Sequence, residues 1–133
     1  MSKIFNISEA ASLAIHSLAL IAKSEKQINA NMIAEMTNFS KNHLSKILQR
    51  LVKYDYIRSE RGPKGGFVLN KDSKEITLLE IYETIEGVLE IPKCKIHKGD
   101  CLFSSCIYGG MGEKLTSEFR EYLKNKTIYD AIK

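Results

Sequence analysis

A basic amphipathic segment followed at once by a glycine-rich basic segment is the strongest constraint on how this 133-residue chain folds. Residues 40–50 read Ser-Lys-Asn-His-Leu-Ser-Lys-Ile-Leu-Gln-Arg, and their apolar positions continue to Leu51 at i, i+3, i+4 and i+7. Residues 56–61 and 66–69 are short strand-like runs joined by Gly62-Pro-Lys-Gly-Gly66, a composition typical of a tight turn. The pattern predicts a helix with one apolar and one cationic face, followed by a β-hairpin.

The remaining apolar periodicity is helical and predicts a mostly α fold. Further helices are expected over residues 8–23, 29–36, 76–87, 102–124 and 127–132, with Ser8, Ser40 and Thr77 as N-caps. The short turn at residues 37–40 joins two helices, the second of them basic, as in a helix-turn-helix. The chain therefore divides into a winged helix-turn-helix over 1–87, a cysteine loop over 88–101, and a long helix with a tail over 102–133.

Positive charge is concentrated in the same region. Residues 40–71 hold eight Lys or Arg and two acidic residues, a net charge of +6, whereas the rest of the chain carries −2. A cationic patch on a slightly acidic protein favours a polyanionic partner, and a solvated lysine-rich face is the alternative. With the helix and the hairpin, this charge predicts a winged helix-turn-helix that binds double-stranded DNA.

Two other classes are disfavoured by what the sequence lacks. It has no nucleophile–base pair, no paired carboxylates on one face and no phosphate-binding loop outside the hairpin, so an enzyme is not expected. No apolar run approaches the length of a membrane span, and no signal-peptide pattern opens the chain, so a cytoplasmic protein is expected.

The DNA contacts can be assigned to individual positions. The first residues of a recognition helix usually reach base edges, so Asn42, His43 and Lys46 are candidates for base reading, although His43 could equally pack in the turn. Phosphate contacts are expected from Ser40, Lys41, Ser45 and Arg50. In the hairpin, the cations Arg58, Arg61 and Lys64 are expected on phosphate or in a minor groove, with Gly65 allowing close backbone approach.

Three cysteines, Cys94, Cys101 and Cys106, lie within thirteen residues and can converge on one metal centre. Their spacing does not match a zinc knuckle and suits an iron–sulfur cluster at least as well, while isolated reactive or buried thiols are the alternative. A four-coordinate centre needs one more ligand. The candidates are His97 and Asp100 in the loop and Glu9, Ser12 and His16 on the first helix.

The chain resembles the IscR/NsrR family of bacterial transcriptional regulators, in the Rrf-two superfamily, through residues 14–22, 31–35, 40–48, 58–69 and 76–82. The likeness covers nearly the whole chain and is most specific in the hairpin, residues 58–69, and in Ile76-Thr-Leu-Leu-Glu-Ile-Tyr82. It implies a homodimer in which the long C-terminal helices cross, and a near-palindromic operator. It also implies a [2Fe–2S] or [4Fe–4S] cluster that senses iron–sulfur, redox or nitric oxide status, with Cys94, Cys101 and Cys106 matching the cluster cysteines.

The chain also departs from that family. Gly109 stands where some members carry a histidine ligand, and Ser12 stands where others carry an acid on the first helix. A histidine that one type of member uses matches His16, so His16 is the preferred fourth ligand and His97 the second choice. Two alternatives stay open: a cluster-free thiol- or ligand-responsive regulator, and a metal- or thiol-binding accessory protein that acts through protein partners.

Overall fold

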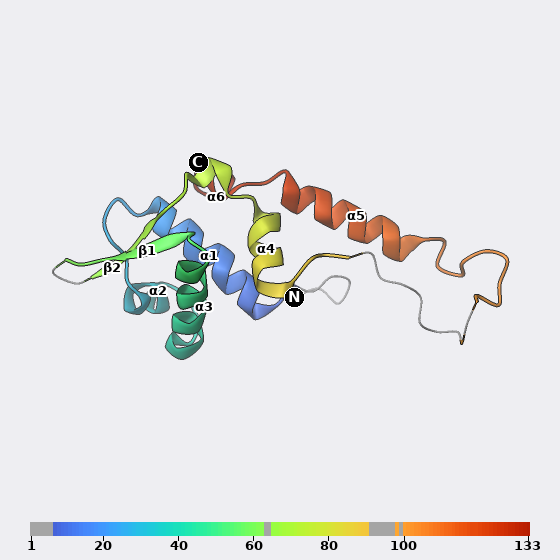
Figure 1. Ribbon diagram of the computed structural model, residues 1–133, viewed down its shortest axis with the longest axis horizontal. Helices are drawn as coiled ribbons and strands as arrows, with labels where there is room; N and C mark the ends of the chain where they lie inside the picture. Colours follow the sequence, from blue (N-terminus) through green and yellow to red (C-terminus); the bar gives the residue numbers. More distant parts are fainter. Residues whose placement is uncertain (1–6, 63–64, 91–97, 99) are drawn as a thin grey trace.

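The computed structural model describes residues 7–62, 65–90, 98 and 100–133. In chain order the elements are α1 (Glu9–Lys23), α2 (Ala30–Met36), α3 (Lys41–Lys53), β1 (Ile57–Glu60), β2 (Gly66–Leu69), the 3₁₀ turn η1 (Ser73–Glu75), α4 (Leu78–Glu86), α5 (Met111–Lys124) and α6 (Ile128–Ile132). Helices α1–α4 and α6 form one body with the β1–β2 hairpin at one end, and α5 extends away from this body (Figure 1). The mostly α fold with a small hairpin, predicted from the sequence, is confirmed.

Side-chain caps explain where the helices begin. The N-cap side chains Ser8, Asn29 and Ser40 each accept a hydrogen bond from the backbone N–H three residues further on. Thr77 and Thr127 form capping boxes, in which the side chain three residues later also bonds back to the cap. Such caps satisfy N–H groups that the helix itself leaves unpaired. The predicted caps at Ser8, Ser40 and Thr77 are confirmed.

The hydrophobic core is arranged around α1, which packs against α3, α4, α6 and β2. Its buried side chains include Leu13, Leu18 and Ile21. The predicted stripe of α3 is confirmed, because Leu44, Ile47, Leu48 and Leu51 are all buried. Full burial of one such side chain contributes roughly 1.5–3 kcal/mol, so this stripe alone holds α3 firmly on the body.

The chain's last helix is built into the same core. Ile128 of α6 is fully buried, and its backbone N–H donates to the Ile76 carbonyl at 2.9 Å. The Leu78 N–H likewise donates to the Lys126 carbonyl at 2.9 Å, which closes an isolated antiparallel bridge between Thr77 and Thr127. The tail expected together with the long C-terminal helix therefore packs on the N-terminal body.

The long C-terminal helix is shorter than predicted. It was expected from Leu102, but it begins at Met111, and residues 102–110 form bends and turns. Gly109 and Gly110 adopt φ of 61° and 74°, which lies in the left-handed region and interrupts a right-handed helix. The prediction was therefore wrong for residues 102–110, because two glycines outweighed the apolar periodicity.

Helix α5 touches the body on one side only. The Phe119 ring meets the Tyr82 ring of α4 edge to face, with centroids 5.7 Å apart, and Leu123 is buried. Along the helix, Met111, Leu115 and Tyr122 remain exposed. No helix in the described part of the chain is both long and apolar enough to cross a bilayer.

The burial of α6 predicts that the C-terminal residues stabilise the whole body. Ile128→Ala should lower the free energy of unfolding by about 2–5 kcal/mol, because it removes apolar volume from a packed core. Met36→Ala, at a half-exposed side chain on α2, is the control and should change it by no more than about 0.5 kcal/mol. Chemical denaturation checks both; equal, small effects would show that α6 does not belong to the core.

Candidate nucleic-acid interface and cysteine segment

The turn between α2 and α3 is fixed by short-range hydrogen bonds. The Thr37 hydroxyl donates to the Ile33 carbonyl at 2.8 Å, and Ser40 caps α3 three residues later. With the inner stripe of α3 buried, its opposite face is open. The exposed side chains of that face are Lys41, Asn42, Lys46 and Gln49, with Ser45 half-buried. Asn42 and Lys46, predicted base readers, thus lie on the solvent-facing side of the first turns of α3.

His43, the third predicted base reader, is turned toward α1. Its Nδ1 lies 3.5 Å from a carboxylate oxygen of Glu9, and its side chain is only about a third exposed. The contact joins α3 to the start of α1. A role for His43 in base reading stays a prediction. The contact with Glu9 fits the alternative of packing in the turn, and the exposed part of the ring fits a contact with DNA.

Arg50 is held by the body rather than standing free on α3. Its Nη2 donates to the carbonyl oxygens of Thr84 and Ile85 in α4, at 3.2 and 3.4 Å. The residue is half-buried, unlike Lys41 and Lys46. A phosphate contact by Arg50 stays a prediction, and any such contact would have to share the guanidinium with these two carbonyls.

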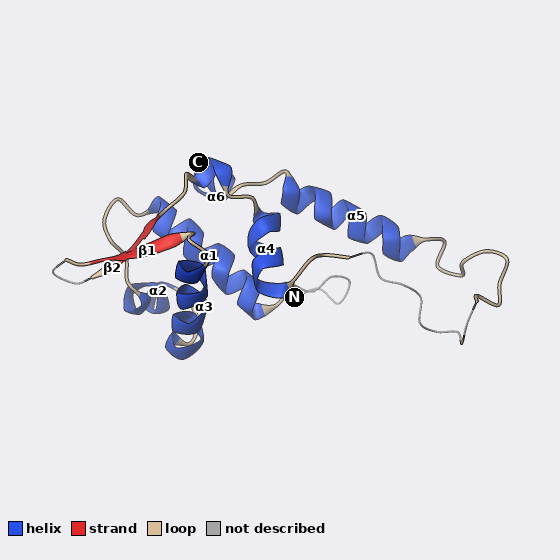
Figure 2. Cartoon of the chain, in the orientation of Figure 1, coloured by secondary structure: helices blue, strands red, loops and turns tan. Residues whose placement is uncertain are grey.

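The hairpin expected after α3 is a two-stranded antiparallel sheet, in which Ile57 pairs with Leu69 and Glu60 with Gly66 (Figure 2). The segment between α1 and α2 pairs with it, because the Phe67 N–H donates to the Ile28 carbonyl at 2.9 Å. At Gly66, φ is 153° and a Cβ would lie 2.9 Å from the Gln27 Cβ. Only glycine fits this approach, so the base of the wing is locked against residues 27–28.

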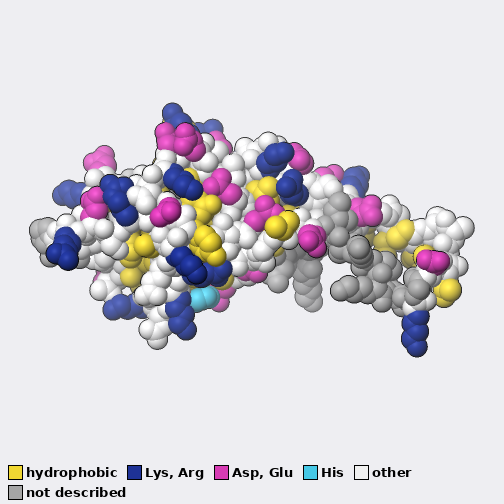
Figure 3. Space-filling view, in the orientation of Figure 1, with side chains coloured by type: hydrophobic (Ala, Val, Ile, Leu, Met, Phe, Trp, Pro, Cys, Tyr) yellow, Lys and Arg dark blue, Asp and Glu magenta, His cyan; other side chains and the backbone are white. Residues whose placement is uncertain are grey.

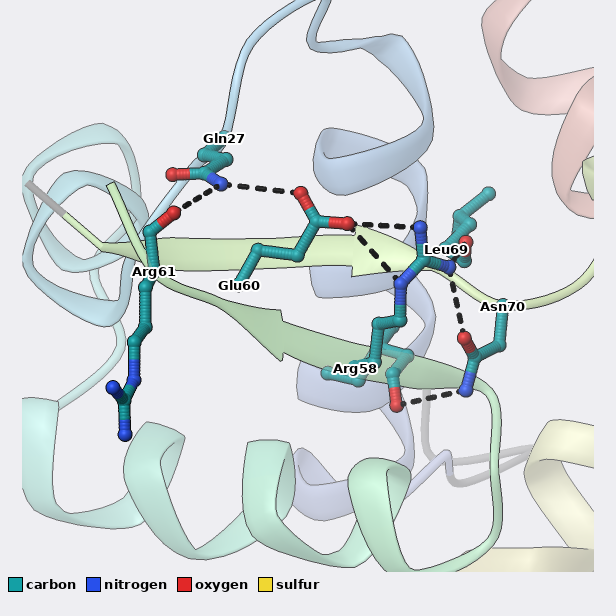
Figure 4. Close-up of polar contacts among 7 residues, drawn as sticks. Gln27, Arg58, Glu60, Arg61, Leu69 and Asn70 are labelled. Carbon is teal, nitrogen blue, oxygen red and sulfur yellow. Dashed lines mark hydrogen bonds and ion pairs between the residues drawn. The ribbon is translucent and has the colours of Figure 1, made fainter.

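A polar network extends from this contact to Arg61, directly after β1 (Figure 4). The Gln27 amide donates to the Glu60 carboxylate at 3.2 Å and to the Arg61 carbonyl at 3.4 Å. Hydrogen bonds from Gln27 first, and from Arg58 second, hold the pKa of the Glu60 carboxyl below its ordinary value. Gln27 thereby tethers the wing strand to the chain that enters α2.

The two wing arginines of the described chain differ in availability. Arg58 forms an ion pair with Glu60 at 2.9 Å and also donates to the Leu69 carbonyl at 3.1 Å and the Asn70 amide oxygen at 2.9 Å. Arg61 is exposed, and its guanidinium points away from this network (Figure 4). Arg61 is therefore the wing cation placed to meet an external anion; Lys64 lies outside the described residues.

The surface view agrees with this distribution. Lys and Arg side chains lie on the wing and along the edge formed by α2 and α3, whereas on the opposite edge and toward α5 basic and acidic side chains are mixed (Figure 3). Of the cations anticipated over residues 40–71, Lys41 and Lys46 of α3 and Arg61 of the wing are exposed. Gln27 was not anticipated as part of this region, because an isolated glutamine in a polar connection carries no signal of its partners.

Two of the three cysteines fall within the described chain. Cys101 and Cys106 are both free thiols and both exposed. The backbone N–H groups of Gly110 and then Tyr108 hydrogen-bond the Cys106 sulfur and lower the pKa of this thiol, which favours the thiolate, the form that binds metals and reacts with oxidants. Cys94 and the alternative ligand His97 lie outside the described residues. No group of three or more His, Cys, Asp or Glu side chains that could hold a metal occurs among the described residues.

His16, the preferred fourth ligand, is exposed on α1. Its Nδ1 lies 2.7 Å from the Ser12 carbonyl oxygen, and its ring meets Phe39 edge to face at 6.1 Å. A ring nitrogen that donates to a backbone carbonyl leaves Nε2 for a metal, the arrangement typical of ligating histidines. Within one chain, however, α1 lies well apart from residues 100–110 (Figure 1).

A helix-turn-helix with a two-stranded wing, and cations gathered on both, defines a winged helix-turn-helix transcriptional regulator. The sequence matches the Rrf2 family, described as an iron-dependent transcriptional regulator, over residues 7–133. The chain therefore belongs to the Rrf2 family and is a DNA-binding regulator rather than an enzyme.

Sequence relatives support this assignment. An HTH-type transcriptional regulator of Aquifex aeolicus is 28% identical over 123 residues, covering 86% of this chain and 85% of the relative. BadM of Rhodopseudomonas palustris is 41% identical over 69 residues, which span 52% of this chain and 44% of BadM. IscR of Escherichia coli is 27% identical over 101 residues, covering 75% of this chain and 62% of IscR. The alignments with BadM and IscR thus span less than two thirds of those proteins.

Solved structures share the fold. CymR, the global cysteine regulator of B. subtilis, superimposes with a TM-score of 0.77 at 22% identity, over 96% of both chains. IscR of T. potens gives a TM-score of 0.73 at 20% identity, over 96% of this chain and 86% of that one. The winged-helix architecture predicted from the sequence is confirmed.

The lock at the base of the wing is testable at two neighbouring glycines. Gly66→Ala should destabilise the hairpin and speed hydrogen exchange at the Phe67 amide, because the new Cβ meets Gln27 and the Ile28 backbone. Gly65→Ala is the matched control: its φ is 62°, but a Cβ there would have no neighbour within 4 Å. It should cost only the strain of a left-handed residue, about 1–2 kcal/mol. Equal exchange at Phe67 in the two variants would refute the lock.

Proposed function

We propose that this regulator binds a near-palindromic DNA operator as a homodimer, and that an iron–sulfur cluster held by Cys94, Cys101 and Cys106 sets its affinity. The observation that carries the DNA-binding part is the exposed polar face of α3 beside Arg61 of the wing. A recognition helix and a wing on one edge can reach a major groove and the adjacent backbone together.

The roles at the interface follow from exposure. Asn42 and Lys46 are assigned to base edges, since Asn matches adenine and Lys matches guanine. Ser40, Lys41 and Ser45 are assigned to phosphates, which position the protein without reading sequence. Arg61 is assigned to phosphate or to the minor groove, and Gly65 brings the wing backbone close. Arg58 acts inside the wing, where it keeps β1, the strand that leads into Arg61, in place.

The proposed homodimer is supported by the apolar side chains left open on α5. Met111, Leu115 and Tyr122 are 51%, 43% and 60% exposed, and Ile107 just before the helix is 71% exposed. Such a row of apolar residues on a projecting helix is unfavourable in water and favours a helix of a second copy as its partner. Two copies joined through α5 would present two recognition helices, as a near-palindromic operator requires.

The cysteine segment fits a cluster in its donor chemistry. Cysteine thiolates are the usual ligands of iron–sulfur clusters, and Cys106 is already biased toward the thiolate by backbone N–H groups. Cys101 and Cys106 are exposed and unpaired by a disulfide, so both sulfurs are open to iron. A bound cluster would supply a redox- and nitric-oxide-sensitive group at this segment. Because α1 lies apart from residues 100–110, His16 would reach the cluster from the other subunit.

A second candidate is a cluster-free regulator that senses oxidants through its thiols. The exposure of Cys101 and Cys106 and the lowered pKa of the Cys106 thiol favour it. A structurally similar protein, CymR of Staphylococcus aureus, has been solved in an oxidized form, at a TM-score of 0.78 and 23% identity. Protein that is colourless after anaerobic purification and loses thiols to peroxide as its DNA affinity changes would favour this candidate.

The DNA-binding proposal predicts separate effects for helix and wing. Against a duplex selected by the wild-type protein from a random-sequence pool, Lys46→Ala should weaken binding by about 1–3 kcal/mol, as loss of a base contact does. Arg61→Ala should lower the slope of log affinity against log salt by about 1. Lys74→Ala, where the ammonium lies over the Tyr129 ring of α6, is the control and should leave binding unchanged. Titrations at several salt concentrations measure all three.

The cluster proposal predicts the metal content of cysteine variants. Anaerobically purified wild-type protein should carry iron and acid-labile sulfide in stoichiometric amounts and absorb visible light. Cys101→Ala and Cys106→Ala should lose both while remaining folded, since both side chains are exposed. His16→Ala should retain less iron than the wild type. Full iron and sulfide in Cys101→Ala would exclude this cysteine as a ligand.

A further inference from the structure

The C-terminal end of α4 is capped by a side chain from α3. The last four carbonyls of a helix have no partner inside that helix. In α4 two of them, those of Thr84 and Ile85, accept hydrogen bonds from Arg50 Nη2 at 3.2 and 3.4 Å. A guanidinium here also meets the negative end of the helix dipole. Arg50 therefore caps the C-terminal end of α4, a role that residues following a helix usually fill.

The exit of the chain from α4 is fixed next to this cap. Gly87 has a φ of 92°, and its N–H donates to the Glu83 carbonyl at 2.8 Å. The Leu89 N–H donates to the Glu83 carboxylate at 2.8 Å. Residues 87–90 thus leave the helix along a defined path, and they are the described residues that immediately precede the segment containing Cys94.

A second set of contacts joins the same elements. The Ser8 hydroxyl, at the start of α1, donates to the carboxylate of Glu86 in the last turn of α4. The next residue, Glu9, lies 3.5 Å from His43 in the first turn of α3. Helix α3 is therefore tied to the end of α4 directly through Arg50 and indirectly through the start of α1.

We infer that Arg50 is a positioning residue that couples the position of α3 on DNA to the conformation of residues 86–90. The inference rests on the proposed role of α3 as the recognition helix. A rearrangement of the last turn of α4 would remove two acceptors from a half-buried guanidinium, which shifts α3. Since coupling between two sites is reciprocal, DNA held by α3 must in turn stabilise the end of α4.

The reciprocal effect gives a test that requires no cluster. Hydrogen exchange of the full-length chain is measured with and without a saturating duplex selected by the wild-type protein from a random-sequence pool. In the wild type, DNA should slow exchange at the Gly87 and Leu89 amides at least about fivefold, the lower end of usual coupling. In Arg50→Gln this slowing should fall below about twofold. Arg50→Lys, which keeps the charge and lacks the guanidinium, should show the same loss.

Lys46→Gln is the matched control. It removes an exposed cation of α3, so it should weaken DNA binding and still show the full slowing at saturation. Circular dichroism confirms that each variant is folded. A merely structural role for Arg50 would speed exchange equally with and without DNA, leaving the DNA-dependent ratio unchanged.

The outcomes separate this inference from the proposed function. Wild-type binding to the duplex without any slowing at Gly87 and Leu89 would overturn the inference and leave DNA binding intact. Full slowing in both Arg50 variants would also overturn it. Failure of the wild-type protein to select any duplex would instead refute the proposed function, and the inference with it.

Discussion

Burial of one face of α1 is the interaction on which the rest of this molecule depends. Leu13, Leu18 and Ile21 pack into a core that also receives the inner stripe of α3 and Ile128 of α6. The chain that leaves α1 then pairs with the wing through Ile28 and Phe67. Helix α3 and the wing, the two elements assigned to DNA, are thus both held in place by α1 and the chain that follows it. Their relative position is therefore set by apolar packing and by the bridge between Ile28 and Phe67, not by DNA.

Polar contacts then decide which cations remain for an external partner. Guanidinium groups seek several acceptors, and Arg58 and Arg50 find them within the protein, in the wing and at the end of α4. Lys41, Lys46 and Arg61 stay exposed. Two of the eight basic residues between 40 and 71 thus also stabilise the geometry in which the others are presented.

Local features of this fold were readable from the sequence, and features that depend on distant partners were not. The stripe of α3, its Ser40 cap and the hairpin follow from neighbouring residues and were predicted correctly. The start of α5 was misplaced because the left-handed conformations of Gly109 and Gly110 are not dictated by apolar periodicity. Nothing in the sequence pairs Gln27 with Glu60, or Arg50 with α4, since those contacts span more than thirty residues.

We propose that the state of the cysteine segment sets the affinity of this Rrf2-family regulator for DNA. The most direct measurement is the dissociation constant for its selected duplex, determined without oxygen before and after an iron chelator is added. The dissociation constant should change at least about fivefold, the lower end of usual coupling between two sites. Complete loss of iron with an unchanged dissociation constant would contradict it.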